Sequence, residues 1–293
     1  EQDKPGGVCL NWGCIPSKTL IHQADLLRGI PDLQELGVAV DAAGLDLAKA
    51  FNKSRLAADR LSKGVQFLLK KNGIALIQGE GRLAAPTELV LDGERRIAAR
   101  AIILATGSRP RELPGLAFDE TTVLSSTGAL ALKRLPRRIA ILGAGAIGLE
   151  MGYVWNAFGA EITIIEAMDR ILPLEDADAA ALVRKIFEKR GVKFIAGAFA
   201  GAGARGPSGI SIDLKPAKEG AGADLPPRIE ADAVLVAVGR VPNVAGLGLE
   251  EIGVALERGF VPVGDFGQTA AKGVYAIGDV VATPQLAHVA SKE

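Results

Sequence analysis

The sequence predicts an α/β protein built around a parallel sheet. Hydrophobic residues make up 48% of the 293 residues, charged residues 23% and aromatic residues only 4%. This composition is typical of globular α/β proteins and not of disordered or collagen-like chains. A complete strand, helix and strand unit is predicted between residues 137 and 166. At about 150 residues per domain, the length predicts two domains.

The charge balance argues against several classes of partner. Lys and Arg number 34, and Asp and Glu also number 34, so no net field draws the chain onto nucleic acid or an anionic membrane. Apolar runs such as 101–105 and 233–238 are far shorter than the about 20 residues that cross a bilayer, and the first residues form no signal peptide. We therefore expect a cytoplasmic protein. Its first residue, Glu1, and its uncapped last residues suggest a piece of a longer polypeptide.

The two cysteines of the chain, Cys9 and Cys14, are five residues apart. In a regular helix this spacing puts two residues about 140° apart around the axis and more than about 7 Å from each other, too far for a disulfide. We therefore expect the backbone to leave the helical conformation at Gly13. Cys9 is predicted to lie in an irregular loop, and Cys14 at the N-terminal end of a helix that runs through Leu27, with Pro16 in its first turn.

A thiolate at Cys14 would be stabilised by the helix dipole and by Lys18, so we interpret the cysteine pair as redox-active. Two buried cysteines without a chemical role are one alternative. Half of a metal site is another, but only His22 and His288 exist to complete it.

A glycine fingerprint joins a predicted strand, 137–142, to a helix that runs to about residue 158. Gly143 allows a tight turn, Gly145 lets the backbone approach a pyrophosphate, and Gly148 permits close helix packing. The phosphates would lie at the helix N-terminus. This context predicts a dinucleotide site, although a glycine-rich turn without a ligand is the alternative reading.

The next strand, 161–165, ends in Glu166. Glu166 could accept hydrogen bonds from a ribose 2′-hydroxyl and would repel a 2′-phosphate, which favours NAD over NADP. Arg170 is close to Glu166 in the sequence and could bind a 2′-phosphate, so NADP remains the alternative cofactor. Glu150 is expected in the first helical turn, either as an acid that complements the helix dipole or as the partner of a lysine near the nicotinamide.

Other segments are less specific. Residues 102–107, 233–238 and 274–279 are strands that run into small residues, and each is either an ordinary buried strand or a binding edge. Residues 45–71 show helical spacing of apolar residues, and 198–227 resemble a β-meander with a loose loop.

The cysteine segment reads Gly6-Gly7-x-Cys9-x-x-x-Gly13-Cys14-x-Pro16. This pattern resembles the active-site signature of the FAD-dependent pyridine nucleotide-disulfide oxidoreductases, and segments 15–18 and 148–150 most resemble the dihydrolipoamide dehydrogenases of that family. The similarity extends over essentially the whole chain. It includes 79–81, 105–107, 239–243, 269–279 and 286–288.

The resemblance implies roles for individual residues. Cys9 would exchange with lipoyl sulfur, and Cys14 would contact the flavin. Lys18 would lie near the flavin and pair with Glu150. The residues implied for FAD are Glu1, Lys18, Gly81, Thr106, Gly107, Asp279 and Ala287. Those implied for NAD are Gly143, Gly145, Gly148, Glu150, Glu166 and Gly239. No metal is implied.

The resemblance also implies an architecture of two Rossmann-like domains in three layers, a parallel sheet plus a β-meander. The FAD domain would comprise residues 1–113 and 242–293, and the NAD domain, 114–241, would be inserted in it. The expected function is flavin-dependent oxidation of dihydrolipoamide with reduction of NAD, as the E3 component of 2-oxoacid dehydrogenase complexes. The expected partners are a lipoyl-bearing carrier domain and a second copy in a homodimer, without nucleic acid or membrane.

Two parts of the family pattern are missing from the sequence: a first FAD-binding strand with its glycine fingerprint, and a C-terminal dimerisation domain. The chain alone is therefore expected to be catalytically incomplete. A sister disulfide reductase, resembling mercuric or glutathione reductase, and a catalytically incomplete NAD-binding fragment are the alternatives.

Overall fold

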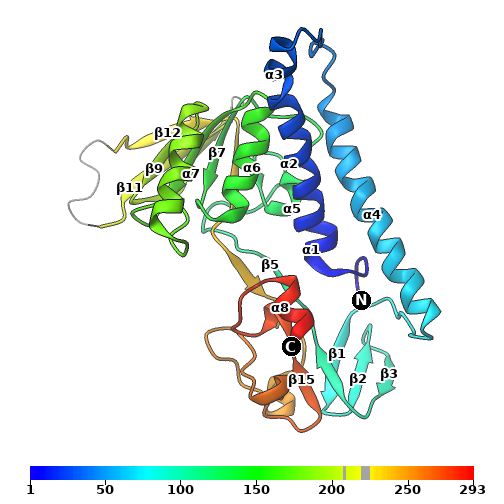
Figure 1. Ribbon diagram of the computed structural model, residues 1–293. Coiled ribbons are helices and arrows are strands. Elements are labelled where there is room, and N and C mark those ends of the chain that lie inside the picture. Colours follow the sequence, from blue (N-terminus) through cyan, green and yellow to red (C-terminus); the bar gives the residue numbers. More distant parts are fainter. Residues whose placement is uncertain (207–208, 219–224) are drawn as a thin grey trace. The chain divides into compact units, whose positions relative to one another are not determined.

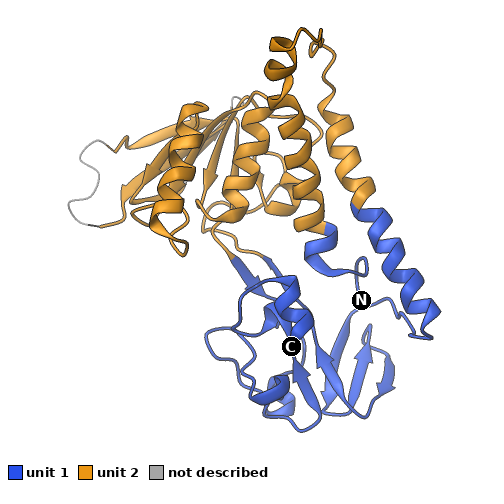
Figure 2. Ribbon diagram, viewed as in Figure 1, with its two compact units in different colours: residues 1–11, 58–109, 240–293 blue, residues 12–57, 110–239 orange. Residues whose placement is uncertain are grey.

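The computed structural model describes residues 1–206, 209–218 and 225–293. They form two compact units, shown in Figure 2. Unit 1 consists of Glu1–Asn11, Ala58–Arg109 and Arg240–Glu293, and unit 2 of Trp12–Ala57 and Pro110–Gly239. Among the described residues, no helix has the length and apolarity needed to span a membrane.

The units differ from the expected domains chiefly at residues 12–57, which belong to unit 2 although a domain of 1–113 was expected. The reason lies in helix α2 (Cys14–Arg28), which packs along α6 (Ala146–Ala157) and buries Leu20 and Ala24 in the core of unit 2. Smaller differences occur at 110–113, which belong to unit 2, and at 240–241, which belong to unit 1. The assignment of one nucleotide to each domain stays a prediction.

A five-stranded sheet forms the centre of unit 2, and its neighbouring strands are parallel (Figure 1). Its strands in spatial order are β6 (Val123–Leu124), β13 (Ala233–Val236), β7 (Arg138–Leu142), β8 (Glu161–Glu166) and β9 (Lys193–Ala196). Strands buried on both faces consist of nearly continuous apolar residues, as β13 does. The strand, helix and strand unit predicted around the glycine fingerprint is present as β7, α6 and β8.

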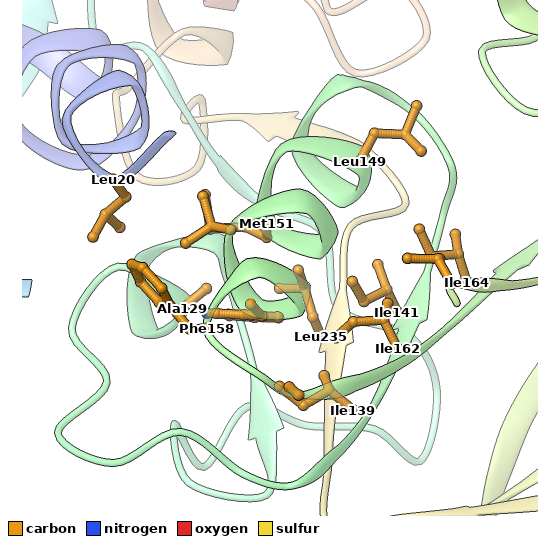
Figure 3. Close-up of a cluster of buried hydrophobic side chains, with 14 of the residues drawn as sticks. Leu20, Ala129, Ile139, Ile141, Leu149, Met151, Phe158, Ile162, Ile164 and Leu235 are labelled. Atoms are coloured by element: carbon orange, nitrogen blue, oxygen red, sulfur yellow. The ribbon is translucent and has the colours of Figure 1, made fainter. Parts of the chain in front are cut away.

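Side chains of β7 alternate between two layers. Ile139 and Ile141 pack against the helices in the cluster that Figure 3 shows, whereas Ala140 and Leu142 face an antiparallel sheet on the other side. The helical layer contains α2, α5 (Ser126–Ala129), α6 and α7 (Ala177–Lys189). The antiparallel sheet has the order β10 (Ala198–Gly206), β11 (Gly209–Pro216) and β12 (Arg228–Ala231). The predicted three layers, parallel sheet and β-meander are therefore confirmed, whereas the expected loose loop falls largely on 219–224, outside the described residues.

Unit 1 contains three small sheets. An antiparallel sheet joins β1 (Gly81–Ala85), β2 (Glu88–Leu91) and β3 (Arg95–Ala98). Strand β4 (Ile102–Leu104) pairs in parallel with β15 (Val274–Ala276), and β5 (Ser108–Pro110) pairs with β14 (Arg240–Pro242). The short helices are η1 (Glu250–Ile252), η2 (Asp265–Gly267), η3 (Gly278–Val280) and α8 (Ala287–Lys292). Three further helices are α1 (Gly7–Trp12), α3 (Ile30–Glu35) and α4 (Leu47–Lys71). Helix α3 is in unit 2, and α1 and α4 contain residues of both units.

The carboxylate of Asp119 holds the turn before β6. It accepts hydrogen bonds from the backbone amides of Thr121, Thr122 and Val123, at 2.7 to 2.9 Å, and from the hydroxyl of Thr121. Burial of the carboxyl group acts to raise its pKa, but these hydrogen bonds outweigh burial and lower the pKa from 3.8 to about 2. The ionised carboxylate thus stabilises the folded state.

This depressed pKa predicts a pH dependence of stability. The contribution of Asp119 is fully present above the unfolded pKa of 3.8 and is lost as the pH falls towards about 2. We expect Asp119→Asn to lower the free energy of unfolding at neutral pH, and the difference from wild type to shrink between about pH 4 and about pH 2. Urea unfolding across this range measures it. A difference that stays constant through this window would contradict the assignment.

Candidate active site

The cysteine segment consists of two helices separated by one residue. Helix α1 ends at Trp12, Gly13 has φ −146° and ψ −109°, and α2 begins at Cys14. Both cysteines are disulfide-bonded, and no free cysteine exists among the described residues. The expected departure from the helix at Gly13 is confirmed, and so is the helix that begins at Cys14. Cys14 is exposed, and Cys9 is half-buried.

The prediction that Cys9 lies in an irregular loop is wrong, because Cys9 is in α1. A buried side chain that the sequence analysis did not single out stabilises this short helix. The Asn11 side-chain amide donates to the carbonyl oxygens of Lys4, Pro5 and Gly7, at 3.2, 3.3 and 3.1 Å. These hydrogen bonds tie α1 to the segment that precedes it and leave the buried amide of Asn11 with acceptors.

An ion pair joins the cysteine helix to the fingerprint helix. The Lys18 ammonium lies 2.6 Å from Oε1 of Glu150, and the side chain of Glu150 is only 28% exposed. Glu150 is in the second turn of α6, because this helix begins at Ala146. Its expected place in the first turn is therefore wrong. Interaction with the dipole falls off beyond the first turn, so the pairing with Lys18 explains this carboxylate better.

Two more contacts fix α2 against α6. The Tyr153 hydroxyl donates to the carboxylate of Asp25, and Arg28 donates to the side-chain oxygen of Asn156 at 2.8 Å. Burial and the hydrogen bond to Asp25 both raise the pKa of Tyr153, so this hydroxyl remains a donor at neutral pH. Sequence reasoning missed both contacts, since their partners are 128 residues apart.

The glycine turn between β7 and α6 leaves no room for side chains at two positions. Gly143 has φ +102°, and a Cβ there would lie 2.4 Å from the carbonyl oxygen of Ala237. A Cβ at Gly148 would lie 2.0 Å from the carbonyl oxygen of Gly143. A Cβ at Gly145, the residue before α6, would meet nothing within 4 Å. The turn therefore presents open backbone at a helix N-terminus, which fits a pyrophosphate.

Glu166 and Arg170 flank this turn. Glu166 accepts from the backbone amide of Ala144 at 2.7 Å and from that of Met168 at 2.9 Å. The guanidinium of Arg170 donates to three carbonyl oxygens within 172–175, at 2.8 to 3.0 Å. Because these bonds hold Arg170 in its own loop, the positive charge is less available to a 2′-phosphate. Gly239, with φ +109°, follows β13 at the same sheet edge as Gly143.

Apart from Lys18, which is in unit 2, the residues expected to bind FAD lie in unit 1, in two groups. Glu1 lies beside the 77–81 segment: its ammonium group donates to the carbonyl oxygen of Ile77, and its own carbonyl oxygen accepts from Gly79. Gly81 is the first residue of β1. The second group consists of Thr106, Gly107, Asp279 and Ala287.

Asp279 is the carboxylate of this second group. One carboxylate oxygen, Oδ2, accepts from the hydroxyl of Ser108. Within the residues that the structure describes, the other oxygen, Oδ1, makes no hydrogen bond. Ala287 begins α8, which packs on η3, the turn that carries Asp279. A carboxylate oxygen left open in this way fits the polyol chain of a flavin cofactor.

Residues 3–293 match the family model described as "Pyridine nucleotide-disulphide oxidoreductase". The chain belongs to this family. "Dihydrolipoyl dehydrogenase 3" of Pseudomonas aeruginosa is 40% identical over 296 residues, which cover 98% of this chain and 62% of that protein. "Dihydrolipoamide dehydrogenase" of Chaetomium thermophilum is 39% identical over 295 residues, 98% of this chain and 58% of that protein.

Solved structures of disulfide oxidoreductases have the same fold. LpdA from Mycobacterium tuberculosis superimposes with a TM-score of 0.89 at 29% identity, over 100% of this chain and 63% of that one. The "HOCl-induced flavoprotein disulfide reductase RclA" from Escherichia coli has a TM-score of 0.82 at 30% identity, over 100% of this chain and 62% of that one. This chain spans about three fifths of the length of the relatives that it matches.

Proposed function

We propose that this chain is the nucleotide-binding and redox-disulfide part of a dihydrolipoyl dehydrogenase, which oxidises dihydrolipoamide to lipoamide and reduces NAD. One observation carries the proposal above all. The disulfide-bonded Cys14 begins the same helix whose Lys18 is ion-paired with Glu150 of the glycine-fingerprint helix. The helix that begins at Cys14 and the glycine-fingerprint helix are therefore connected within unit 2, and the relatives named above carry this activity in their names.

The thiol chemistry follows from the placement of the two cysteines. A thiolate of dihydrolipoamide attacks Sγ of Cys9, the bond between Cys9 and Cys14 breaks, and Cys14 leaves as a thiolate. The second substrate thiol then attacks the mixed disulfide, which forms lipoamide and releases the Cys9 sulfur with its electron pair. The substrate thus loses two electrons and two protons, and the cysteine pair gains the electrons. The N-terminus of α2 stabilises the Cys14 thiolate.

FAD, when bound, supplies the two-electron transfer between a dithiol and a nicotinamide. Asp279, Thr106, Gly107, Gly81, Glu1 and Ala287 are proposed to hold it, with Lys18 as a nearby cation that Glu150 orients. In the NAD site, Gly145 leaves the turn open to the pyrophosphate, and Gly143 and Gly148 keep the turn tight. Glu166 accepts hydrogen bonds from the ribose, and Gly239 contacts NAD at the edge of the sheet. The predicted division, FAD on 1–113 and 242–293 and NAD on 114–241, is part of this proposal.

We further propose a homodimer, a lipoyl-bearing carrier domain of a 2-oxoacid dehydrogenase complex as the partner, and the cytoplasm as the location. The homodimer and the carrier domain rest on the family resemblance, and the location rests on the short apolar runs of the sequence. Glu166 and the engaged guanidinium of Arg170 support NAD as the nicotinamide.

Turnover with defined substrates tests the proposal. We expect the full-length protein that contains this chain, reconstituted with FAD, to form NADH from dihydrolipoamide and NAD, and to do so at least about tenfold more slowly with NADP, because Glu166 repels a 2′-phosphate. NADH absorbance measures both rates. Turnover of glutathione disulfide with NADPH, but not of dihydrolipoamide, would instead indicate the sister enzyme. FAD-loaded full-length protein that turns over neither substrate would contradict the proposal.

A further inference from the structure

Three segments of unit 1 that are far apart in the sequence meet at one hydrogen-bond network. Ser108 comes from β5, Arg240 from β14 and Asp279 from η3. Arg240 donates from Nε to the Ser108 hydroxyl and from Nη2 to the Ser108 carbonyl oxygen, each at 2.6 Å. The Ser108 hydroxyl in turn donates to Oδ2 of Asp279, and Arg240 Nε lies 3.9 Å from that same oxygen. A single hydroxyl thus bridges the guanidinium and the carboxylate.

This network is largely buried. The side chains of Arg240 and Asp279 are 13% and 20% exposed, and Ser108 is 3% exposed. Burial lowers the pKa of Arg240, and the charge of Asp279 raises it. A charged pair with so little water around it is maintained only where each charge has good partners. The network is therefore a specific feature and not a chance surface contact.

The geometry also fixes the direction of the hydroxyl proton. Because Ser108 Oγ accepts from Arg240, its own hydrogen is free to point to Asp279. Two hydrogen bonds join the segments that carry Ser108 and Arg240. The Thr106 hydroxyl donates to the Asn243 carbonyl oxygen at 2.7 Å, and the side-chain amide of Asn243 donates to the Thr106 carbonyl oxygen at 3.0 Å. Ser108 and Arg240 are thus presented to Asp279 from a rigid pair of segments.

We propose that Ser108 and Arg240 are positioning residues for Asp279. They engage Oδ2 and thereby present Oδ1, which makes no hydrogen bond among the described residues, to a hydroxyl of the flavin's polyol chain. This inference rests on the proposed function, because it takes Asp279 as a flavin ligand. A carboxylate whose rotation is already restricted loses less conformational freedom when the ligand binds, so removal of its support weakens binding.

A merely structural role for Ser108 makes a different prediction. If Ser108 only tied β5 to η3, its effect on FAD affinity would be independent of the Asp279 side chain. If Ser108 acts through Asp279, the effect disappears once that carboxylate is gone. A double-mutant cycle with Ser108→Ala and Asp279→Ala therefore separates the two roles.

The experiment measures the FAD dissociation constant of the full-length apoprotein by quenching of flavin fluorescence. Because Ser108→Ala loses a hydrogen bond to a charged group, its affinity for FAD should be about tenfold weaker than that of wild type. In the Asp279→Ala background, the same substitution should not change the affinity for FAD. Ser108→Thr, which keeps a hydroxyl, should restore most of the affinity. Arg240→Lys keeps the charge but loses the forked donors, and should fall between wild type and Ser108→Ala.

Ser54→Ala is the matched control. Ser54 is also fully buried, and its hydroxyl donates only to the carbonyl oxygen of Phe51, so FAD affinity should not change. The same Ser108 and Asp279 cycle in urea unfolding without FAD tests the contact itself, and non-additive unfolding free energies are expected.

The outcomes are distinguishable. If the wild-type protein binds FAD, either of two results overturns this inference alone. One is an FAD affinity of Ser108→Ala equal to that of wild type, and the other is additive effects of Ser108→Ala and Asp279→Ala on FAD affinity. Additive unfolding free energies of Ser108→Ala and Asp279→Ala also overturn it. Wild-type protein that binds no FAD overturns the inference and the proposed function together.

Discussion

Replacement of Cys9 with Ser should abolish dihydrolipoamide turnover, with a loss on the order of 10³ or more, because a serine hydroxyl cannot form or exchange the disulfide that splits the reaction into two steps. The affinity for NAD should stay within about twofold of wild type, since Cys9 is not part of the proposed NAD site at Glu166 and the glycine turn. NADH formation and NAD binding by calorimetry measure the two effects.

Cys14→Ser provides the matched comparison. It should abolish turnover equally, and each variant should leave one thiol that reacts with an alkylating reagent, whereas the oxidised wild type has none among the described residues. Residual dihydrolipoamide turnover above about one tenth of wild type in either variant would contradict the role of the disulfide, because loss of an essential nucleophile costs far more.

Two alanine substitutions in the glycine turn should differ in their effect on the free energy of unfolding. Gly148→Ala should lower the free energy of unfolding by about 3 kcal/mol or prevent folding, because its Cβ would lie 2.0 Å from the backbone oxygen of Gly143. Gly145→Ala should leave that free energy within about 1 kcal/mol of wild type, because its Cβ meets nothing within 4 Å and φ is −79°.

The same Gly145→Ala protein should bind NAD about tenfold or more weakly, because its methyl group occupies the space where a pyrophosphate approaches the backbone. Thermal unfolding and calorimetry with NAD measure these changes. A folded Gly148→Ala protein of wild-type stability, or Gly145→Ala with unchanged NAD affinity, would contradict the structural basis of the dinucleotide site.

Local patterns predicted the fold where sequence neighbours determine the structure. The strand β7, the turn at Gly143 and the strand β8 follow from apolar runs and from the need for glycine in a tight turn. The helix at Cys14 and its break at Gly13 likewise follow from local backbone preferences. The errors at Cys9 and Glu150 also have local causes. A side-chain amide, Asn11, stabilises α1, and the glycine turn uses residues 143–145 before α6 begins.

Contacts between distant segments could not be predicted in this way. Nothing in the sequence relates Tyr153 to Asp25, or Ser108 to Arg240 and Asp279, because no periodicity connects segments whose proximity arises only from the topology. The grouping of residues 12–57 with unit 2 has the same origin, since packing of α2 on α6 decides it. The pairing of Lys18 with Glu150 was expected only from the family resemblance.

Electron uptake tests most directly whether the disulfide and the nucleotide sites form one redox centre. An anaerobic dithionite titration of the FAD-loaded full-length protein should consume about four reducing equivalents per chain, two for the disulfide and two for the flavin, and about two in Cys9→Ser or Cys14→Ser. Uptake of only about two equivalents by the wild type, with both cysteines still protected from alkylation, would contradict a functional link between the disulfide and the flavin.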